Sequence, residues 1–544
     1  MGKTTTIIIV AEGAIDRKNS PIRPEHVKEV ISKQLELDCR VTTLGHVQRG
    51  GTTSAFDRFL ATLQGVEAVE AILEPHDSSL AVLIGINQNK VTRRPLMESV
   101  MQTRSVSEAI KNGEFDKAFC LRDAYFKANY RLIESLKVQH NEIQLEKRYN
   151  IGLINVGAPC GGMNIANRAV VHYCLNQGHR ILGIYNGFHG LEAGEIKDLT
   201  RADVDSWVSM GGSELGTNRH LPENDLGLIA CQLQKFEISA LVIIGGFEAF
   251  ISVVQLARNR HLYPALAIPT ICLPATVSNN VPGTDFSIGS DTALNSIMDM
   301  CDCIKQSASS SRKRLFVVDV QGGHCGYLAT VSSLITGSTY SYIHEEGVRL
   351  ADLMREAKHL RNRFSEDKRQ GRIILRNEFC SETYSAEVMS KIFEEEAEGS
   401  FDCRWVSLGH IVQGGRPSPL DRIRATRLAV MAVNYVEAFL CPERLNDGVK
   451  DQYLKMKNEE ISAFTDNLKQ TEDENQVYNS EMVKLLGSNS KLAAAIIGIH
   501  GPEIKCTSAV ELVEKATILK YRIPKNQWWF FLRKINKIMA KYSE

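Results

Sequence analysis

The sequence lacks a hydrophobic run long enough to cross a membrane, because none of its apolar segments reaches the ~18 residues that a transmembrane helix requires. It also lacks an excess of charge of either sign: its 64 Lys and Arg residues balance its 64 Asp and Glu residues. Proteins that bind nucleic acids or membrane surfaces usually carry a basic excess. The composition therefore argues against both classes of partner, and its 43% hydrophobic and 24% charged residues are typical of a globular protein.

The sequence has no paired cysteine motif. Its 13 cysteines are scattered, the closest pair being Cys301 and Cys303, and neither C-x-x-C nor a His/Cys cluster of zinc spacing occurs. With no secretory signal, reduced thiols and a cytoplasmic location are predicted. The dinucleotide fingerprint G-x-G-x-x-G is also absent, because the glycine-rich segment at 157–164 reads GAPCGGMN. A nicotinamide-dependent dehydrogenase is therefore a poor interpretation.

The sequence does contain one phrase twice. Residues 38–51 read DCRVTTLGHVQRGG and residues 402–415 read DCRWVSLGHIVQGG. Over the 25 positions that begin with each phrase, thirteen are identical. Each phrase follows an apolar run that predicts a core strand and ends near a glutamate, TIIIVAEG with Glu12 and RIILRNE with Glu378. This pattern indicates internal duplication of a large unit.

The two copies differ in what precedes them. The second phrase follows a long α/β segment, whereas the first follows almost nothing, so residues 1–137 are predicted to be the last part of one unit. Residues 138–150 are then a polar linker and residues 151–544 a complete second unit, and a longer form should carry a comparable block upstream. The polar segment 443–480 predicts a surface insertion. The basic, amphipathic end from Tyr521 predicts a helix that docks on the body or, alternatively, lies on a membrane surface.

The second unit alternates β-branched apolar runs with helical segments. Runs such as IGLINV, RILGI, ALVIIG and KRLFVVDV each end in a glycine, a proline or a polar turn. The pattern is typical of doubly wound, largely parallel sheets with flanking helices, an α/β fold. Ligands of such sheets bind at the carboxyl ends of the strands, so the turns that follow the strands form the candidate site.

Two kinds of turn indicate an anion. The turn Gly157–Asn164 could present backbone N–H groups to a phosphate, although a tight structural turn explains it equally well. Arg404 lies six residues before His410, and an arginine fork and an imidazole donor could converge on one anion. For each residue alone a surface charge is the simpler explanation. The recurrence of the pair as Arg40 and His46 favours an anion site.

Together these turns resemble the eukaryotic ATP-dependent 6-phosphofructokinase family over essentially the whole chain. LGHVQRGG followed by SAFDR resembles the end of the family's catalytic half, and GAPCGGMN, LVIIGGFEA, PATVSNNVPGTD, GGHCGYLA and RIPKNQWW resemble its regulatory half. Family members arose by duplication and fusion. The resemblance therefore implies the phosphofructokinase fold with one incomplete and one complete copy, catalysis in the first half and effector binding in the second.

The resemblance implies a fructose 6-phosphate site on the first copy. The glutamate would accept hydrogen bonds from sugar hydroxyls, and the arginines and histidine would hold the 6-phosphate; the contact residues are Glu12, Arg40, His46, Val47, Gln48 and Arg49. In this family such an arginine often reaches across from a neighbouring subunit, which implies a homo- or hetero-oligomer, expected to be a tetramer. The ATP-binding glycines, the magnesium ligand and the catalytic Asp are expected in sequence that this chain does not contain. Mg²⁺ is thus a family cofactor without a ligand here.

In the second copy the catalytic groups are predicted to be absent. The family's T-[IV]-D-x-D turn reads TVSNN at 276–280, and neither Ser nor Asn can act as a general base near neutral pH. The family's magnesium-binding GGDG turn reads GGFE at 245–248, and phenylalanine cannot replace an oxygen ligand. Phosphoryl transfer depends on that metal and on positioning. No catalytic residue and no metal ligand are therefore predicted in this chain.

The resemblance implies that this half binds an activator, fructose 2,6-bisphosphate. Gln413 replaces Arg49 of the first phrase, which suits a different ligand better than a loss of binding. Two positions depart from the family pattern: Gln321 stands where Met is usual, and Val412 where Gln is common. The implied contacts are Arg219, Thr276, Val277, Ser278, Asn279, Asn280, Arg314, Gln321, Gly322, Gly323, Glu378, Arg404, His410, Ile411, Val412, Gln413 and Arg522.

Two hypotheses about function follow. The first is a subunit of an ATP-dependent 6-phosphofructokinase of glycolysis, which binds fructose 6-phosphate, ATP, fructose 2,6-bisphosphate and adenine nucleotides. The alternative is a non-catalytic, sugar-bisphosphate-binding regulatory fragment that assembles with full-length subunits. They differ in whether the whole gene product carries GGDG and T-[IV]-D-x-D upstream. The isolated chain is expected to be inactive, and the nucleotide that the Gly157–Asn164 turn might bind is left open.

Overall fold

The protein forms two compact units in the computed structural model, unit 1 (Met1–Arg131) and unit 2 (Leu132–Glu544). The expected surface insertion at 443–480 lies outside the described residues, as does most of the expected linker, residues 138–147. The structure describes residues 6–74, 81–87, 90–137, 148–366, 371–440, 493–501 and 503–540.

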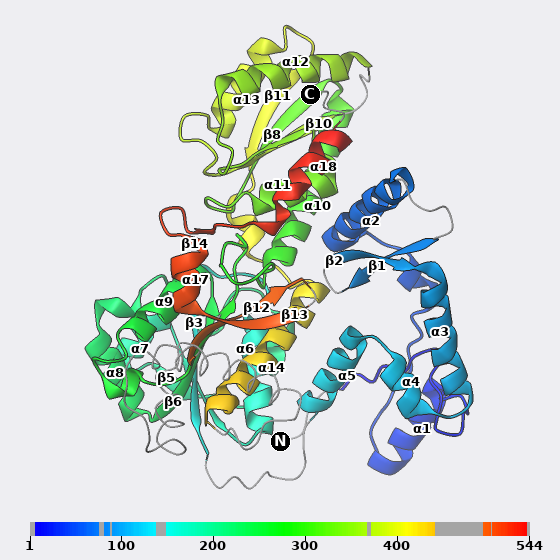
Figure 1. Cartoon of the computed structure of the whole chain (residues 1–544), viewed down its shortest axis with the longest axis vertical. Coiled ribbons are helices and arrows are strands. Elements are labelled where there is room, and N and C mark those ends of the chain that lie inside the picture. The colour runs from blue at the N-terminus through cyan, green and yellow to red at the C-terminus, as the bar shows by residue number, and fades with distance from the viewer. Residues whose placement is uncertain are drawn as a thin grey trace, which may run out of the picture. The chain divides into compact units, whose positions relative to one another are not determined.

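Unit 1 consists of helices beside a short antiparallel hairpin (Figure 1). Arg93 on the hairpin pairs at 2.5 Å with Glu67 of the second helix and with Glu74, the residue that follows this helix. Few side chains are buried, so the hydrophobic core of this unit is small. Its elements are α1 (Pro24–Leu35), η1 (Gly45–Arg49), α2 (Ala55–Leu73), β1 (Val82–Asn87), β2 (Lys90–Pro95), α3 (Leu96–Lys111), α4 (Phe115–Leu121) and the first part of α5 (Ala124–Leu136).

The core strand predicted for TIIIVAEG does not form. Residues 6–11 are irregular, and Ile7 and Ile9 are 88% and 91% exposed. A strand that is apolar on both faces is stable only within a sheet that is covered on both sides. The described part of unit 1 offers only the β1–β2 hairpin, which does not include this segment. The prediction of a core strand before Glu12 is therefore wrong.

Unit 2 contains a seven-stranded sheet in the order β13-β12-β7-β6-β3-β4-β5. The five inner strands are parallel, as the continuous apolar runs predict, and only the edge strands β5 and β13 are antiparallel. The strands are β3 (Asn150–Val156), β4 (Arg180–Ile184), β5 (Ile196–Asp198), β6 (Ile238–Gly245), β7 (Thr270–Pro274), β12 (Ala494–His500) and β13 (Glu503–Ser508).

Helices cover both faces of this sheet (Figure 1). One face packs against a cluster that includes Phe188, Phe250 and Leu512, and the helices α6 and α14 lie against each other on the opposite face. This arrangement confirms the doubly wound α/β class. The helices are α6 (Met163–Asn176), α7 (Gly187–Ala193), α8 (Leu226–Lys235), α9 (Phe247–Arg258), α14 (Pro419–Leu440) and α17 (Ala509–Lys515), with the 3-10 turns η2 (Asp205–Ser209), η3 (Pro222–Asn224) and η4 (Pro264–Leu266).

A second sheet of four parallel strands in unit 2 has the order β11-β8-β10-β9. Leu353, Phe364 and Phe393 belong to the core on one of its faces, and α10 and α11 contact the strands as well. Its elements are β8 (Arg314–Val320), β9 (Tyr340–Tyr342), β10 (Arg372–Asn377), β11 (Asp402–Ser407), α10 (Ser290–Ser311), α11 (Tyr327–Thr336), α12 (Leu350–Glu366), α13 (Ala386–Glu396) and η5 (Gly409–Gln413).

The second part of the duplicated phrase adopts the same local structure in both units, whereas its first part forms β11 in unit 2 and is irregular in unit 1. Each copy forms a 3-10 turn that begins at a glycine with positive φ, Gly45 at 58° and Gly409 at 54°. A side chain is rarely tolerated at such a φ, which explains why glycine recurs there. Ser54 and Ser418 then accept a hydrogen bond from the backbone N–H three residues on, at 3.1 Å and 3.2 Å, and so cap the helices α2 and α14.

The C-terminal segment docks on unit 2, as the first of the two alternatives predicted. The 3-10 turn η8 (Trp528–Phe531) and helix α18 (Leu532–Met539) follow a two-stranded ribbon, β14 (Thr517–Ile518) and β15 (Ile523–Pro524). Trp529 is 1% exposed beside Tyr327, and Arg533 pairs with Glu346 at 2.6 Å. The segment is thus held by a buried indole and an ion pair.

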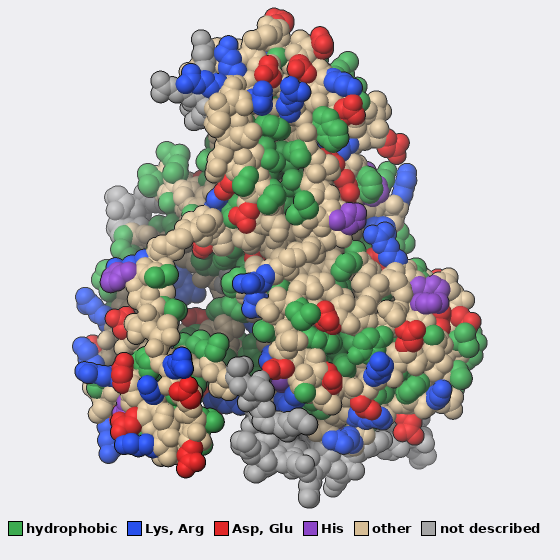
Figure 2. Space-filling view, turned by 180° about the vertical axis from the view of Figure 1, so that it is seen from behind, with side chains coloured by type: hydrophobic (Ala, Val, Ile, Leu, Met, Phe, Trp, Pro, Cys, Tyr) green, Lys and Arg blue, Asp and Glu red, His purple; other side chains and the backbone are tan. Residues whose placement is uncertain are grey.

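The surface agrees with the balanced charge of the sequence. On the face shown in Figure 2, Lys and Arg side chains are interspersed with Asp and Glu side chains. Among the described residues, no helix is long and apolar enough to cross a membrane. The cysteines within the described ranges are free thiols, as expected.

Candidate functional site

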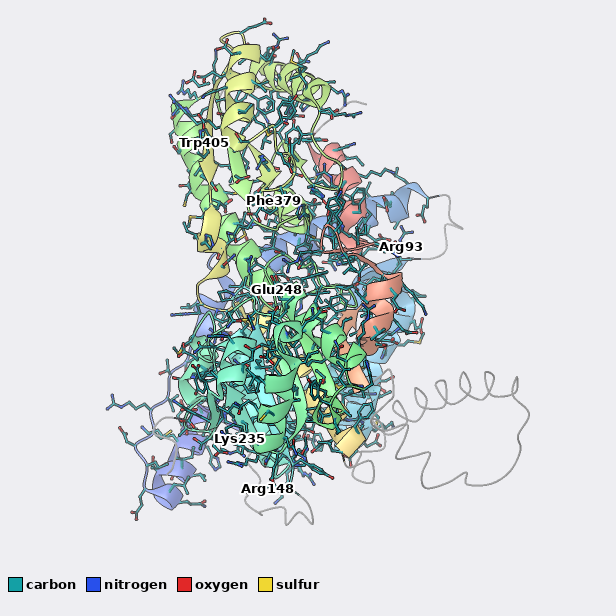
Figure 3. The ribbon with its side chains drawn as sticks, turned by 90° about the vertical axis from the view of Figure 1, so that its left-hand side faces the viewer. Arg93, Arg148, Lys235, Glu248, Phe379 and Trp405 are labelled. Atoms are coloured by element: carbon teal, nitrogen blue, oxygen red, sulfur yellow. The ribbon has the colours of Figure 1, made fainter. Side chains whose placement is uncertain are left out.

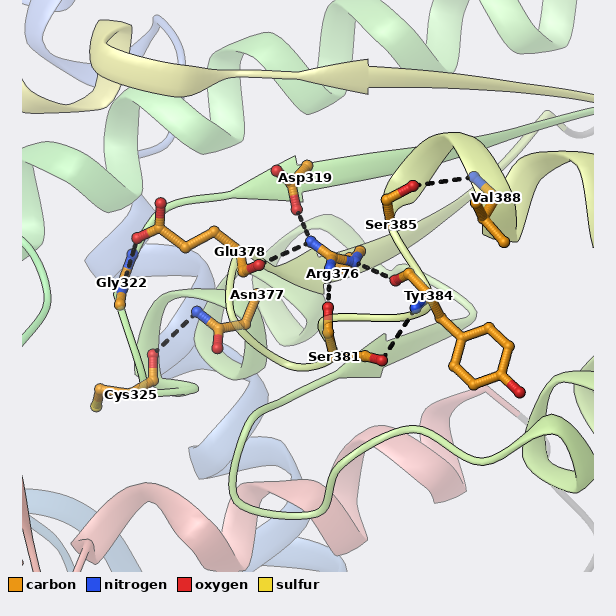
Figure 4. Close-up of polar contacts among 11 residues, drawn as sticks. Asp319, Gly322, Cys325, Arg376, Asn377, Glu378, Ser381, Tyr384, Ser385 and Val388 are labelled. Atoms are coloured by element: carbon orange, nitrogen blue, oxygen red, sulfur yellow. Dashed lines mark hydrogen bonds and ion pairs between the residues drawn. The ribbon is translucent and has the colours of Figure 1, made fainter. Parts of the chain in front are cut away.

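A carboxylate closes the turn that follows β8. Glu378, one residue beyond β10, accepts hydrogen bonds from the backbone N–H groups of Gly322 (3.1 Å) and Gly323 (2.6 Å), as Figure 4 shows for Gly322. The two parallel strands β8 and β10 are neighbours, so their carboxyl ends bring these residues together. Three of the predicted contact residues therefore form one cluster.

Arg376 holds the segment around Glu378 in place. Its guanidinium is buried and donates to Asp319 (2.6 Å) and to three backbone carbonyls, those of Glu378 (3.0 Å), Ser381 (2.9 Å) and Tyr384 (3.0 Å) (Figure 4). Such forked, charge-assisted bonds fix both the side chain and the loop around it. The RNE motif thus contains a positioning arginine two residues before the predicted contact.

The repeated phrase adds a neutral pair to this cluster. The amide of Gln413 donates to Oε1 of Gln321 at 2.8 Å. Val412 is buried, whereas His410 and Ile411 are exposed on η5. Val412 therefore packs in the core, which explains why an apolar residue stands where the family often has Gln.

The turn after β7 is rigid. Asn279 adopts φ 51°, donates from Nδ2 to the carbonyl of Asp285 (2.8 Å) and accepts from the N–H of Ser287 (2.6 Å). The neighbouring Asn280 donates to the carbonyl of Arg522 (3.0 Å), which joins this turn to the C-terminal segment. Thr276 and Val277, at the start of the turn, are buried and Ser278 is partly buried. The predicted residues 276–280 are therefore brought together with Arg522.

Two arginines meet one glutamate at the start of α9. The guanidinium of Arg522 lies 2.6 Å from Oε1 of Glu248, and Nε of Arg219 lies 3.6 Å from the same oxygen. Arg522 also stacks over the ring of Phe247, with its guanidinium carbon 5.2 Å from the ring centroid. This cluster carries two fixed positive charges and one negative charge.

Arg314 and Arg404 lie apart from these groups within one chain. Arg314 is the first residue of β8 and donates a hydrogen bond to Asp402 (3.4 Å). Arg404 lies on the edge strand β11, opposite Phe316 of β8. Strands rise about 3.3 Å per residue, so Arg314 is roughly 20 Å from Gln321 along β8. The position of Arg404 within β11 and of His410 on η5 leaves their convergence on one anion a prediction.

The predicted residues of the first copy are all exposed on unit 1. Nε of Arg40 lies 3.5 Å from Asp38. These two residues correspond in the repeated phrase to Arg404 and Asp402. Among the described residues, Glu12 accepts no hydrogen bonds from glycine N–H groups such as those that Glu378 accepts from Gly322 and Gly323. The remaining predicted contacts lie on the exposed turn η1, namely His46, Val47, Gln48 and Arg49.

The described residues of unit 2 do not fit a magnesium ion. Phe247, at the position expected to hold the metal, is 3% exposed and packs edge-to-face on Phe250. Within the described ranges, no group of three or more His, Cys, Asp or Glu side chains could hold a metal. The turn at 276–280 supplies amides and hydroxyls but no carboxylate. We therefore assign no metal-dependent step to this unit.

The fold defines a doubly wound α/β protein in which predicted contact residues such as Gly322 and Glu378 meet at the carboxyl ends of parallel strands. Comparison with known proteins specifies the family. The family model for phosphofructokinase matches residues 1–72 and 150–436. The chain belongs to the phosphofructokinase family.

Relatives with known names agree. The chain is 44% identical over 542 residues to the ATP-dependent 6-phosphofructokinase subunit beta of Kluyveromyces lactis, covering 98% of this chain and 55% of that protein. It is 45% identical over 538 residues to the subunit of the same name from Saccharomyces cerevisiae, covering 97% and 53%. The chain thus spans about half the length of the curated relatives it matches.

Solved structures show the same fold. The crystal structure of Pichia pastoris phosphofructokinase superposes with a TM-score of 0.88 at 41% identity, covering all of this chain and 58% of that one. The structure of phosphofructokinase from Saccharomyces cerevisiae gives a TM-score of 0.88 at 42% identity, covering 100% and 68%.

Sequence reasoning missed three residues around the site. Arg376 lies in the RNE motif and Glu248 in the LVIIGGFEA motif, and neither motif predicts a contact for them. His324 lies one residue beyond Gly323, with its ring 4.5 Å from that of His344. Burial, then the neighbouring His344 and Arg522, lower the pKa of His324. The adjacency of His324 to a predicted contact was the only sign of it in the sequence.

Proposed function

We propose that the chain is part of a subunit of an ATP-dependent 6-phosphofructokinase, an enzyme that phosphorylates D-fructose 6-phosphate to fructose 1,6-bisphosphate in glycolysis. The family membership and the names of the relatives support this activity for the whole protein. Because the chain spans about half of those relatives, the ATP site and the Mg²⁺ site are assigned to no residue described here.

Within this protein, unit 2 is the binding half and takes fructose 2,6-bisphosphate as an activator. The observation that carries this proposal is the buried phenyl ring of Phe247 beside an arginine pair, Arg219 and Arg522. The site keeps positive charge for phosphate, whereas the turns 245–247 and 276–280 supply neither the metal ligand nor the general base that the family's catalytic half has there. The other predicted contacts of unit 2 remain part of this proposal.

Arg314 and Arg404 act across a subunit boundary. Arg404 is exposed on the edge strand β11, and Arg314, at the start of β8, is partly exposed and pairs with Asp402. Both arginines are proposed to reach a ligand held by another copy or another subunit. An oligomer, proposed to be a tetramer, follows from this use of the arginines. Trp405, on the same strand, is also exposed (Figure 3).

Unit 1 contributes to the substrate site. Glu12 accepts hydrogen bonds from sugar hydroxyls, and Arg40, His46 and Arg49 hold the 6-phosphate. The alternative function is a regulatory fragment that binds the bisphosphate and assembles with full-length subunits. That alternative is favoured by the same lack of a base and a metal ligand in unit 2.

Titration calorimetry with fructose 2,6-bisphosphate tests the binding half. We expect Arg404→Ala to weaken binding about 10- to 100-fold, the usual effect of losing a charge-assisted hydrogen bond. Arg416→Ala removes an exposed arginine a few residues beyond the repeated turn and should leave binding unchanged. Unchanged affinity in Arg404→Ala would refute the assignment. Turnover of fructose 6-phosphate with ATP by the purified chain alone would refute the view that unit 2 is non-catalytic.

A further inference from the structure

The carboxylate of Glu248 stands between two arginines. Glu248 is the second residue of α9, and its side chain is only 12% exposed (Figure 3). Its Oε1 lies 2.6 Å from Arg522 and 3.6 Å from Arg219, which come from segments far apart in sequence. One partly buried negative charge thus holds two guanidinium groups.

The other carboxylate oxygen lies against the glycine-rich turn. A Cβ added to Gly157 would sit 3.0 Å from Oε2 of Glu248, so the carboxylate covers the first residue of the turn Gly157–Asn164. The N–H of Gly157 already donates to the carbonyl of Asn218 at 2.8 Å. A phosphate that approached Gly157 from this side would meet a like charge at contact distance.

A simpler explanation is the helix dipole, which favours an acidic residue in the first turn. A fully solvated glutamate would satisfy that preference. The dipole does not account for the burial of Glu248, for its contact with Gly157 or for the two arginines from other segments. These features are those of an anion site that is already filled.

We propose that Glu248 is a built-in anion: it occupies the phosphate position beside Gly157 and is neutralised by Arg219 and Arg522. Two consequences follow. The turn Gly157–Asn164 does not bind a polyphosphate, and a phosphorylated ligand must take the two arginines over from Glu248. The inference deepens the proposed function and rests on it for the identity of the ligand as a sugar bisphosphate.

The charge of the cluster sets the direction of the effect. Two arginines and one glutamate give a net charge of about +1, and replacing the carboxylate by an amide raises it to about +2. We expect Glu248→Gln to tighten anion binding about 2- to 5-fold, because Arg219 is exposed and Arg522 half-exposed, so that their pairing with Glu248 is correspondingly weak. The gain should shrink as salt is added, since exposed charges are screened.

The experiment is titration calorimetry on the full chain with inorganic pyrophosphate and, separately, with fructose 2,6-bisphosphate. Glu248→Asp keeps the negative charge and should stay close to the parent chain. Glu511→Gln removes an exposed glutamate that pairs with Lys515 at 3.2 Å and should change neither affinity. The urea midpoint of each variant, read by tryptophan fluorescence, shows that the protein is folded.

The two ligands separate the inference from the proposed function. Tighter pyrophosphate binding in Glu248→Gln but not in Glu248→Asp supports the built-in anion. Unchanged or weaker binding in Glu248→Gln, or an equal gain in both variants, overturns it, because charge would then not be the cause. If Glu248→Gln binds pyrophosphate more tightly while fructose 2,6-bisphosphate binds to no variant, Glu248 keeps its role and the proposed activator is wrong.

Discussion

Asp421 makes unit 2 sensitive to pH in a predictable direction. It is fully buried at the start of α14, where Oδ2 accepts from the backbone N–H and the hydroxyl of Thr292, both at 2.7 Å. Oδ1 has no hydrogen-bond partner among the described residues. Burial, followed by the repulsion of the neighbouring Asp291, raises the pKa of Asp421 from 3.8 to about 6.

The sign follows from proton linkage. A carboxyl group with a higher pKa in the folded state binds its proton more tightly there, so its contribution to stability is largest below about pH 4 and is lost as the pH rises through 6. The difference between 3.8 and about 6 corresponds to about 3 kcal/mol of stability lost by pH 7.5. Replacement of the carboxylate by an amide should recover part of this energy.

We expect Asp421→Asn to raise the free energy of unfolding of unit 2 by about 1–2 kcal/mol at pH 7.5. The amide oxygen can still accept both bonds from Thr292, and the amide no longer repels Asp291. At pH 4.5 the difference should nearly vanish, because Asp421 of the parent chain is then protonated. Stability is measured by urea unfolding at the two pH values.

Tryptophan fluorescence makes this assay specific. All four tryptophans, Trp207, Trp405, Trp528 and Trp529, lie in unit 2. The control is Asp57→Asn. Asp57 is the residue equivalent to Asp421 in the first copy of the 25-position repeat, is exposed on unit 1 and accepts a hydrogen bond from Ser54. It should not move the fluorescence transition. A less stable Asp421→Asn at pH 7.5, or an equal difference at both pH values, would refute the reasoning.

Two further predictions concern buried contacts of unit 2. Arg376→Lys keeps the charge but loses the forked hydrogen bonds of the guanidinium, and should lower the free energy of unfolding by about 2–4 kcal/mol. The control is Arg355→Lys, which changes an exposed arginine. Equal urea midpoints for the two variants would contradict the role of Arg376. Trp529→Ala removes the indole packed beside Tyr327, and should cost about 3–5 kcal/mol. Limited proteolysis should then cut at α18, and a fully protected α18 would contradict the docking role.

The sequence predicted the class of fold because the strands of unit 2 are buried on both faces and read as continuous apolar runs. It could not predict the division into two sheets. The runs of β7 and β8 look alike locally, and only the 22-residue helix α10 between them carries the chain to the other sheet. The edge strands β5 and β13 were missed since their sequences, IKD and EIKCTS, are short and partly polar.

The site was predictable in residue type more than in arrangement. Residues that directly follow parallel strands, such as Gly322 and Glu378, meet because strand ends share one edge of a sheet. Arg314 and Arg404 sit on strands rather than after them, and a spacing of six residues says nothing about strand direction. Glu248 was overlooked because its partners, Arg219 and Arg522, are brought to it only by tertiary structure.

The change from Arg49 to Gln413 is explained by a second change, at Gln321. The side-chain amide of Gln413 donates a hydrogen bond to the amide oxygen of Gln321 at 2.8 Å in a partly buried place. One donor and one acceptor are thereby paired. A methionine at 321 would leave the Gln413 amide without this acceptor. The turn of the second phrase is therefore fixed by a neutral pair. In the proposed function, positive charge for a phosphate is therefore assigned to other residues, among them the arginines at 219 and 522, which pair with Glu248.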